Sequence, residues 1–184
     1  MEKTKLKCCY GISSKVKNDQ FNRHIFMIDY DHVDIISVKK HLKHLIDVYK
    51  LSDIYLIEST HGYNALSLDL LPIGLIFDMG INVFSPADRD FFKYGFNRQY
   101  YVLRFDIDKK LVEIVKSKYN LHDKSLAHKK FIEWFFNIKI SNSDKFNNNT
   151  KLDVIQYPSN KNGYHLQDKL LPENYIETLA RLRQ

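Results

Sequence analysis

Cysteine is scarce in this chain, and its placement argues against a disulfide and against a thiolate metal site. Only two of the 184 residues are cysteines, and they are neighbours, Cys8 and Cys9. Adjacent cysteines rarely reach good disulfide geometry with each other. Without a C-x-x-C pair the sequence does not support a thiolate zinc site. We therefore expect a reducing, cytoplasmic setting.

Long apolar runs are also missing. The opening stretch "MEKTKLKCCYGISS" has no apolar segment of the kind found in signal peptides. Nowhere does an apolar run approach the roughly 20 residues that a membrane-spanning helix needs. We expect a soluble protein with no membrane partner.

Several catalytic signatures are absent. No GxxxxGK[ST] phosphate-binding loop occurs, which argues against a P-loop ATPase. Ser59 lies near His61 without a nucleophile-elbow motif, which argues against a hydrolase pair. The predicted strands carry no His-hydrophobe-His pair of the rolling-circle nuclease type. His41 and His44, beside lysines on a predicted helix, are typical of a solvated basic face.

The composition that remains is that of an ordinary globular protein with many aromatic residues. Hydrophobic residues make up 44% and aromatic residues 14%, and the formal net charge is +6. The length suits one domain with a real core, so we expect a single domain over 1–184. A basic balance is compatible with nucleic acid, although solvated lysines alone give the same number.

Hydrophobic periodicity predicts an α+β core over 20–110. Strands with a period of two alternate with apolar residues at helical spacing. The order strand, helix, strand, strand, helical segment, strand is the βαββαβ pattern of a ferredoxin-like or RRM-like antiparallel sheet, with helices on one face. In that architecture the first and third strands are central, and the fourth flanks the first. The predicted elements are strand 24–31, helix 34–50, strands 53–59 and 64–70, helical segments beginning near Pro72 and Pro86, and strand 98–108.

Residues 111–184 are expected to form a C-terminal α/β extension. Its most distinct element is a helix with an aromatic face over 125–138. A polar loop near 141–150 is expected to be mobile. The other predicted elements are strands 111–119 and 151–158 and a final helix over 172–184.

The stretch "HIFMIDYDHV" ends an apolar strand with two carboxylates, Asp29 and Asp31. Side chains alternate between faces in a strand, so both carboxylates lie on the face opposite the helices. Asp106, in "VLRFD", joins them if its strand is the neighbour. Three carboxylates that close repel one another unless a cation lies among them, and Mg²⁺ or Mn²⁺ suits oxygen ligands. Arg104 would add positive charge for a triphosphate.

A simpler interpretation stays open. A D-x-D at a strand end often belongs only to a turn or to a helix N-cap, and Asp34 is a candidate cap for the helix that follows.

The motifs "FMIDYD", "ESTHGYNAL" and "VLRFD" together resemble those of the archaeo-eukaryotic primase superfamily, including small plasmid and viral replication proteins. The resemblance covers roughly 20–110. It implies template-directed nucleotidyl transfer on single-stranded DNA from nucleoside triphosphates, with Mg²⁺ or Mn²⁺ held by Asp29, Asp31 and Asp106. It also implies a helicase or an accessory replication subunit as partner. Asp108 replaces Asp106 if the strand register shifts by two.

The second motif of this family ends in a nucleotide-binding histidine. "Ser59-Thr60-His61" fits its small-x-His spelling, whereas alignment on Gly62 and Tyr63 puts Asn64 where the histidine belongs. If Leu66 and Leu68 face the core, His61 faces the site; if Tyr63 and Ala65 do, Asn64 faces it. We favour His61, with Ser59 beside it, and the loss of the histidine would remove a nucleotide contact.

A binding module without chemistry is the alternative function. An RRM-like sheet stacks single-stranded bases on aromatic side chains flanked by cations. A degenerate primase-fold subunit is a further variant of this hypothesis. The expected nucleic-acid contacts are Tyr63, Arg98, Tyr100, Lys109 and Lys110.

Overall fold

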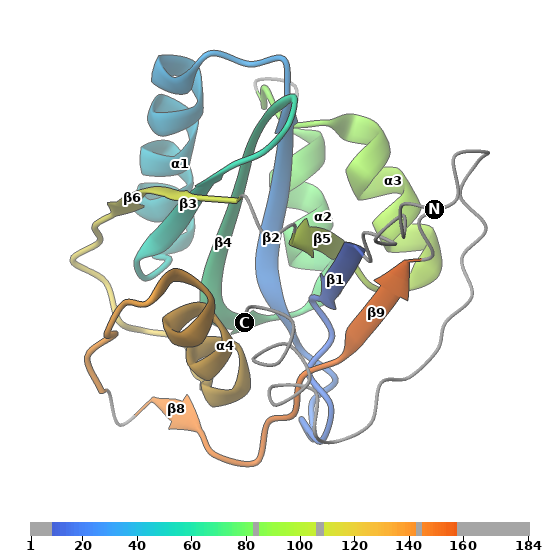
Figure 1. Cartoon of the computed structure of the whole chain (residues 1–184), viewed down its shortest axis with the longest axis vertical. Helices are drawn as coiled ribbons and strands as arrows, with labels where there is room; N and C mark the ends of the chain where they lie inside the picture. The colour runs from blue at the N-terminus through green and yellow to red at the C-terminus, as the bar shows by residue number, and fades with distance from the viewer. Residues whose placement is uncertain (1–8, 83–84, 106–108, 143–144, 158–184) are drawn as a thin grey trace, which may run out of the picture.

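The computed structural model describes residues 9–82, 85–105, 109–142 and 145–157 of the chain (Figure 1). Within these ranges the fold is α+β, as predicted, and antiparallel pairing dominates its sheets. The elements are β1 (Cys9–Ser13), β2 (His24–Asp31), α1 (Ile35–Tyr49), β3 (Ile54–Glu58), β4 (Gly62–Leu71), α2 (Ile73–Ile81), α3 (Arg89–Arg98), β5 (Val102–Phe105), β6 (Leu111–Val115), β7 (Lys124–Ser125), α4 (Leu126–Phe136), β8 (Phe146–Asn147) and β9 (Val154–Tyr157).

The larger sheet is organised around the long strand β4. Strands β2 and β3 pair antiparallel with β4 on its two sides, and β6 pairs with β3. The first and third strands of the predicted unit are therefore neighbours, as expected. In this register Asp29 lies directly opposite Asn64, and Met27 lies opposite Leu66. Because opposite residues in an antiparallel pair share a face, Asn64 lies on the face of the sheet that carries Asp29.

The expected fourth strand does not pair with the first. Strand β5 pairs antiparallel with β1, which also pairs with β9, in a separate three-stranded sheet. The physical reason is that β1 supplies the partner edge, with Gly11 opposite Arg104. The predicted βαββαβ order is thus reproduced for three strands, while the fourth belongs to another sheet.

Helix α1 begins directly after its capping residue, Asp34, and packs on the sheet face that carries Tyr30. The Asp34 carboxylate accepts hydrogen bonds from the backbone N–H groups of Ile36 and Ser37, as an N-cap does. His41 is buried and hydrogen-bonded to the Tyr30 hydroxyl at 2.8 Å. The prediction of a solvated His41 was wrong, because the residue shares its helix face with the buried Val38 and Leu45.

Helices α2 and α3 pack so closely that two glycines are required. A Cβ added to Gly80 in α2 would lie 2.3 Å from the ring of Phe92, which is fully buried. A Cβ added to Gly95 in α3 would lie 2.0 Å from the ring of Tyr101. The helix α3 is therefore held against α2 on one side and against the start of β5 on the other.

The C-terminal extension covers part of the face that carries Asp29. Figure 1 shows α4 on the side of the sheet opposite α2 and α3. Met27, Leu66 and Tyr55, in three adjacent strands on that face, are at most 3% exposed. That face is thus closed in its middle, and the end with Asp29 and Asp31 lies beyond the covered part.

Other expectations about the extension have mixed outcomes. Strand 111–119 appears as β6, helix 125–138 as α4 and strand 151–158 as β9, each shorter than predicted. The short strand β8 lies in the loop predicted near 141–150. The predicted helix over 172–184 falls outside the described residues. None of the helices in the described ranges combines the length and apolar character that crossing a membrane requires.

Candidate functional site

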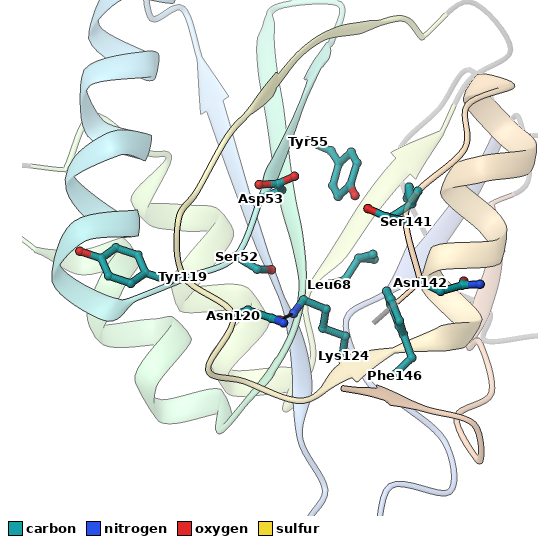
Figure 2. Close-up of a pocket in the computed structure, with 11 residues that line it drawn as sticks. Ser52, Asp53, Tyr55, Leu68, Tyr119, Asn120, Lys124, Ser141, Asn142 and Phe146 are labelled. Atoms are coloured by element: carbon teal, nitrogen blue, oxygen red, sulfur yellow. Dashed lines mark hydrogen bonds between the residues drawn. The ribbon is translucent and has the colours of Figure 1, made fainter. Parts of the chain in front are cut away.

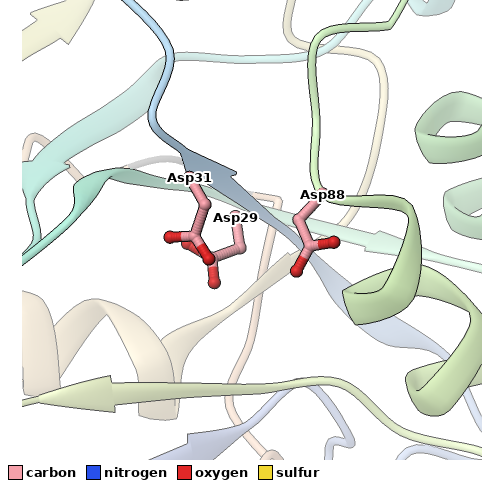
Figure 3. A group of neighbouring side chains, drawn as sticks. All are labelled: Asp29, Asp31 and Asp88. Carbon is pink, nitrogen blue, oxygen red and sulfur yellow. The ribbon is translucent and has the colours of Figure 1, made fainter.

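Three carboxylates meet at the end of β2. Asp29 and Asp31 come from the strand, and Asp88 comes from the residue that precedes α3 (Figure 3). One carboxylate oxygen of each lies within 4.8 Å of the others. Asp31 is exposed, while Asp29 and Asp88 are half-buried. We call Asp29, Asp31 and Asp88 the carboxylate cluster.

The position of Asp88 is fixed by its backbone. Its N–H donates to the carbonyl oxygen of Asp29 at 2.9 Å, which ties the start of α3 to β2. Its carboxylate accepts from the N–H of Asp90 at 2.9 Å and so caps α3. Sequence reasoning missed Asp88. The signal available, an aspartate after "SPA" and before a helix, predicts a cap and does not by itself indicate proximity to β2.

The electrostatics of the cluster favour a bound cation. Burial, followed by the charge of Asp31, raises the pKa of Asp29 to about 6. The charge of Asp88 acts in the same direction, while that of Lys109 opposes it. A cation bound among these carboxylates would act against both causes, because it stabilises the ionised form of Asp29.

Asn64, and not His61, contacts the cluster. The Asn64 amide donates to Asp29 Oδ1 at 2.5 Å, and its own oxygen accepts a hydrogen bond from the Lys109 ammonium. His61 is exposed in the turn before β4, where its ring lies 5.8 Å from that of His32. The register of β2 against β4 accounts for this contact, because it puts Asn64 opposite Asp29. Tyr63 and Ala65 lie on the opposite face of β4, and this alternation turns Asn64 toward the carboxylates.

The remaining site predictions concern the further metal ligands and the nucleotide contacts. Asp106 and Asp108 lie outside the described residues. Arg104 is exposed on β5, whose partner is β1 and not β2. Ser59 lies in the turn after β3, where its N–H donates to the Gly62 carbonyl at 3.0 Å.

The expected nucleic-acid contacts are spread over several elements. Tyr63 lies opposite Tyr30 in the register and hence on the face away from Asp29. Arg98 is exposed in the last turn of α3, and Tyr100 follows it as a half-buried residue. Lys109 reaches Asn64, and the carbonyl of Lys110, itself exposed, accepts from the N–H of Glu58. Lys109 is joined to the carboxylate cluster through Asn64.

A cavity of about 250 Å³ lies near the start of β3 and the second half of β4, away from the end of the sheet that carries Asp29 (Figure 2). Its walls include Asp53, Tyr55 and Lys124. The polar groups here largely satisfy one another: Lys124 donates to Asn120, and Asp53 accepts from Lys116 at 2.9 Å. Burial lowers the pKa of Lys124, which carboxylates nearby partly offset. This cavity is separate from the carboxylate cluster.

The carboxylate cluster is the best candidate for chemistry. Carboxylate oxygens that close are ligands for a hard divalent cation, and Asp31 keeps the site open to solvent. Such an ion can neutralise a phosphate or lower the pKa of a bound oxygen nucleophile. Comparison of the chain with models of protein families, with curated proteins and with solved structures finds no match.

Proposed function

We propose that the protein is a metal-dependent nucleotidyltransferase that copies a single-stranded template, as primase-polymerases do. The observation that carries the proposal is the gathering of Asp29, Asp31 and Asp88 within 4.8 Å at an open end of the sheet. The raised pKa of Asp29 is in keeping with it, because a bound cation would stabilise the ionised carboxylate that burial and Asp31 disfavour. The primase-like motifs of the sequence supply the reaction class.

Each residue has a role in this proposal. Asp29, Asp31 and Asp88 would hold Mg²⁺ or Mn²⁺, and Asp106 remains a predicted further ligand. The ion would supply Lewis-acid activation of a 3′-hydroxyl and charge neutralisation at the triphosphate. Asn64 orients the Asp29 carboxylate through its hydrogen bond, and Lys109 holds Asn64 from the other side. Arg104 would contact the triphosphate only if the nucleotide reaches β5.

Primer extension on a single-stranded template tests the proposal. The assay contains nucleoside triphosphates and Mn²⁺, and it compares the parent with Asp29→Asn, Asp31→Asn and Asp88→Asn. We expect each substitution to lower the rate at least roughly 100-fold, because losing one ligand typically costs metal affinity as well as activity. Asp47→Asn is the matched control, since Asp47 is exposed on α1 and contributes no ligand atom to the cluster. Extension by all three variants at the parental rate would end the proposal.

A non-catalytic replication subunit is the second candidate, and a specific contact favours it. On the alignment through Gly62 and Tyr63, Asn64 takes the place of the primase family's nucleotide-binding histidine, and its amide is hydrogen-bonded to Asp29. An amide carries no ionisable proton and no positive charge for a phosphate. If the parent extends no primer but still binds Mn²⁺ in a manner that Asp29→Asn abolishes, this second function is the better one.

A further inference from the structure

We infer that single-stranded nucleic acid binds across the outer face of α3, immediately beside the carboxylate cluster. We define the α3 face as Arg89, Lys93, Tyr94, Asn97 and Arg98. All five are exposed. This inference rests on the proposed function, because it names where the strand lies relative to the same site.

An exposed aromatic ring in a basic setting is the first observation. The aromatic residue is Tyr94, which is 61% exposed. Its neighbour Phe96 packs instead on Phe77 of α2, with ring centroids 4.5 Å apart. Nucleic-acid bases stack on such rings whatever their sequence, and the interaction is lost when the ring is removed. Tyr94 is therefore a suitable platform for one unpaired base.

Charge is the second observation. Residues four apart lie on one side of a helix, so Arg89, Lys93 and Asn97 form one stripe, and Tyr94 and Arg98 form the next. Asp90 is the one acidic residue within α3, and it pairs with Lys93 at 3.6 Å. Both side chains of that pair are more than 60% exposed, so it contributes little and exchanges readily for a phosphate.

Rigidity is the third observation. Gly80 lets the ring of Phe92 approach α2, and Gly95 lets the ring of Tyr101 approach α3, so α3 packs closely on both sides against buried rings. A platform that is already ordered loses little entropy when a ligand binds. The stacking ring therefore needs no rearrangement to receive a base.

The α3 face lies next to the carboxylate cluster, where the proposed reaction would take place. Asp88 caps α3, and Tyr94 follows it by about 9 Å along the helix axis. The carboxylates repel phosphate, so the backbone of a strand would follow Arg89 and Lys93 and pass beside the cluster. The exposed lysines of α1, Lys40 and Lys43, give a comparison surface of like charge, and the exposed residues of α1 include no tyrosine, phenylalanine or tryptophan.

Fluorescence anisotropy of a labelled oligothymidine, in EDTA and without nucleotides, tests the inference. We expect Tyr94→Ala to weaken binding at least about 5-fold and Tyr94→Phe to retain it, because both rings stack. The double variant Arg89→Gln/Lys93→Gln should reduce the slope of log affinity against log salt by about 1.4. The matched control Lys40→Gln/Lys43→Gln should leave that slope unchanged. A duplex of the same length should bind more weakly than the single strand.

Several results would overturn the inference. They are no binding by the parent, parental affinity in Tyr94→Ala, an equal loss in the α1 control, or a duplex bound as tightly as the single strand. Because the assay contains neither metal nor nucleotide, its result is independent of catalysis. An inactive protein that binds through Tyr94 keeps this inference and ends the enzyme proposal. An active protein that is indifferent to Tyr94 does the reverse.

Discussion

Asn64 joins two oppositely charged side chains, donating from its amide nitrogen to Asp29 at 2.5 Å and accepting on its oxygen from Lys109. The two contacts fix the orientation of the amide, because only the nitrogen can donate and only the oxygen can accept. Asn64 thereby links the Lys109 ammonium to the Asp29 carboxylate, whose pKa is raised in the folded protein. We therefore expect the stability of this end of the sheet to depend on the two hydrogen bonds of Asn64 and on the protonation state of Asp29.

We expect Asp29→Asn to stabilise the apo protein at neutral pH. The pKa of Asp29 is about 6 in the fold and about 4 in an unfolded chain, so the folded state holds the proton more tightly. Its contribution to stability is present below pH 4 and is lost as the pH rises through 6. The gain from the amide should reach up to about 3 kcal/mol at pH 7 and vanish near pH 4. Urea unfolding in EDTA at both values measures it.

The control for this substitution is Asp47→Asn on the exposed side of α1. It should change the unfolding free energy by less than about 0.5 kcal/mol at either pH. Equal stabilities for Asp29→Asn and the parent at pH 7 would contradict the burial of the Asp29 charge.

Asn64→Ala should destabilise the protein. The change removes two hydrogen bonds to charged groups, both on half-buried side chains. We expect a loss of about 1–3 kcal/mol. Asn97→Ala, at an exposed helix position, is the matched control and should be nearly neutral. Chemical denaturation at pH 7 measures both, and a neutral Asn64→Ala would mean that water replaces the lost amide fully.

Gly95→Ala should be more damaging than an ordinary glycine substitution in a helix. The new methyl would lie 2.0 Å from the Tyr101 ring, so α3 must move, and overpacking of this kind costs about 1–3 kcal/mol. Gly74→Ala in α2 meets nothing within 4 Å and should be neutral or stabilising by up to about 1 kcal/mol. Thermal unfolding of the pair measures the contrast. Similar melting temperatures would contradict the packing of α3 against Tyr101.

Acid should destabilise the protein through buried histidines. Burial lowers the pKa of His128 to about 4, and the ring nitrogens are bonded to the Ser125 hydroxyl at 2.7 Å and to the Ser13 carbonyl at 3.1 Å. The neutral ring is the folded form, so its contribution is complete above about pH 6.5 and is lost as the pH falls toward 4.

The loss of stability on acidification should reach up to about 3 kcal/mol for His128 alone. His128→Gln should unfold with a flatter pH dependence between 6.5 and 4, even if it is less stable throughout. His44→Gln, on the exposed side of α1, should keep the parental slope. A slope unchanged by His128→Gln would place the acid sensitivity elsewhere, for instance at His24 or His41, whose pKa values burial also lowers to about 4.

The local elements were predictable because each depends on its own periodicity. The alternation in 24–31 predicts β2, and the apolar spacing from Ile35 onward predicts α1, with Asp34 as its cap. The pairing of β5 was not predictable in this way. Its partner β1 is far away in the sequence, and a short strand such as "CYGIS" carries no pattern that says which edge it will take.

The candidate site was predictable in part for the same reason. Asp29 and Asp31 share a face by alternation alone, and the structure puts them side by side. The choice between His61 and Asn64 depends on the register of β2 against β4, which local alternation leaves open. Asp88 comes from a separate helix start, and its approach to Asp29 follows from the packing of α2 and α3.

The backbone bond between Asp88 and Asp29 has a thermodynamic consequence. A chain whose α2–α3 pair has detached from the sheet still carries the D-x-D, but Asp88 no longer lies beside it. An ion that prefers three carboxylates would therefore bind the docked form more tightly and shift the equilibrium toward it by mass action. The supply of divalent cations would then regulate the cohesion of the two layers, quite apart from any reaction that the ions assist.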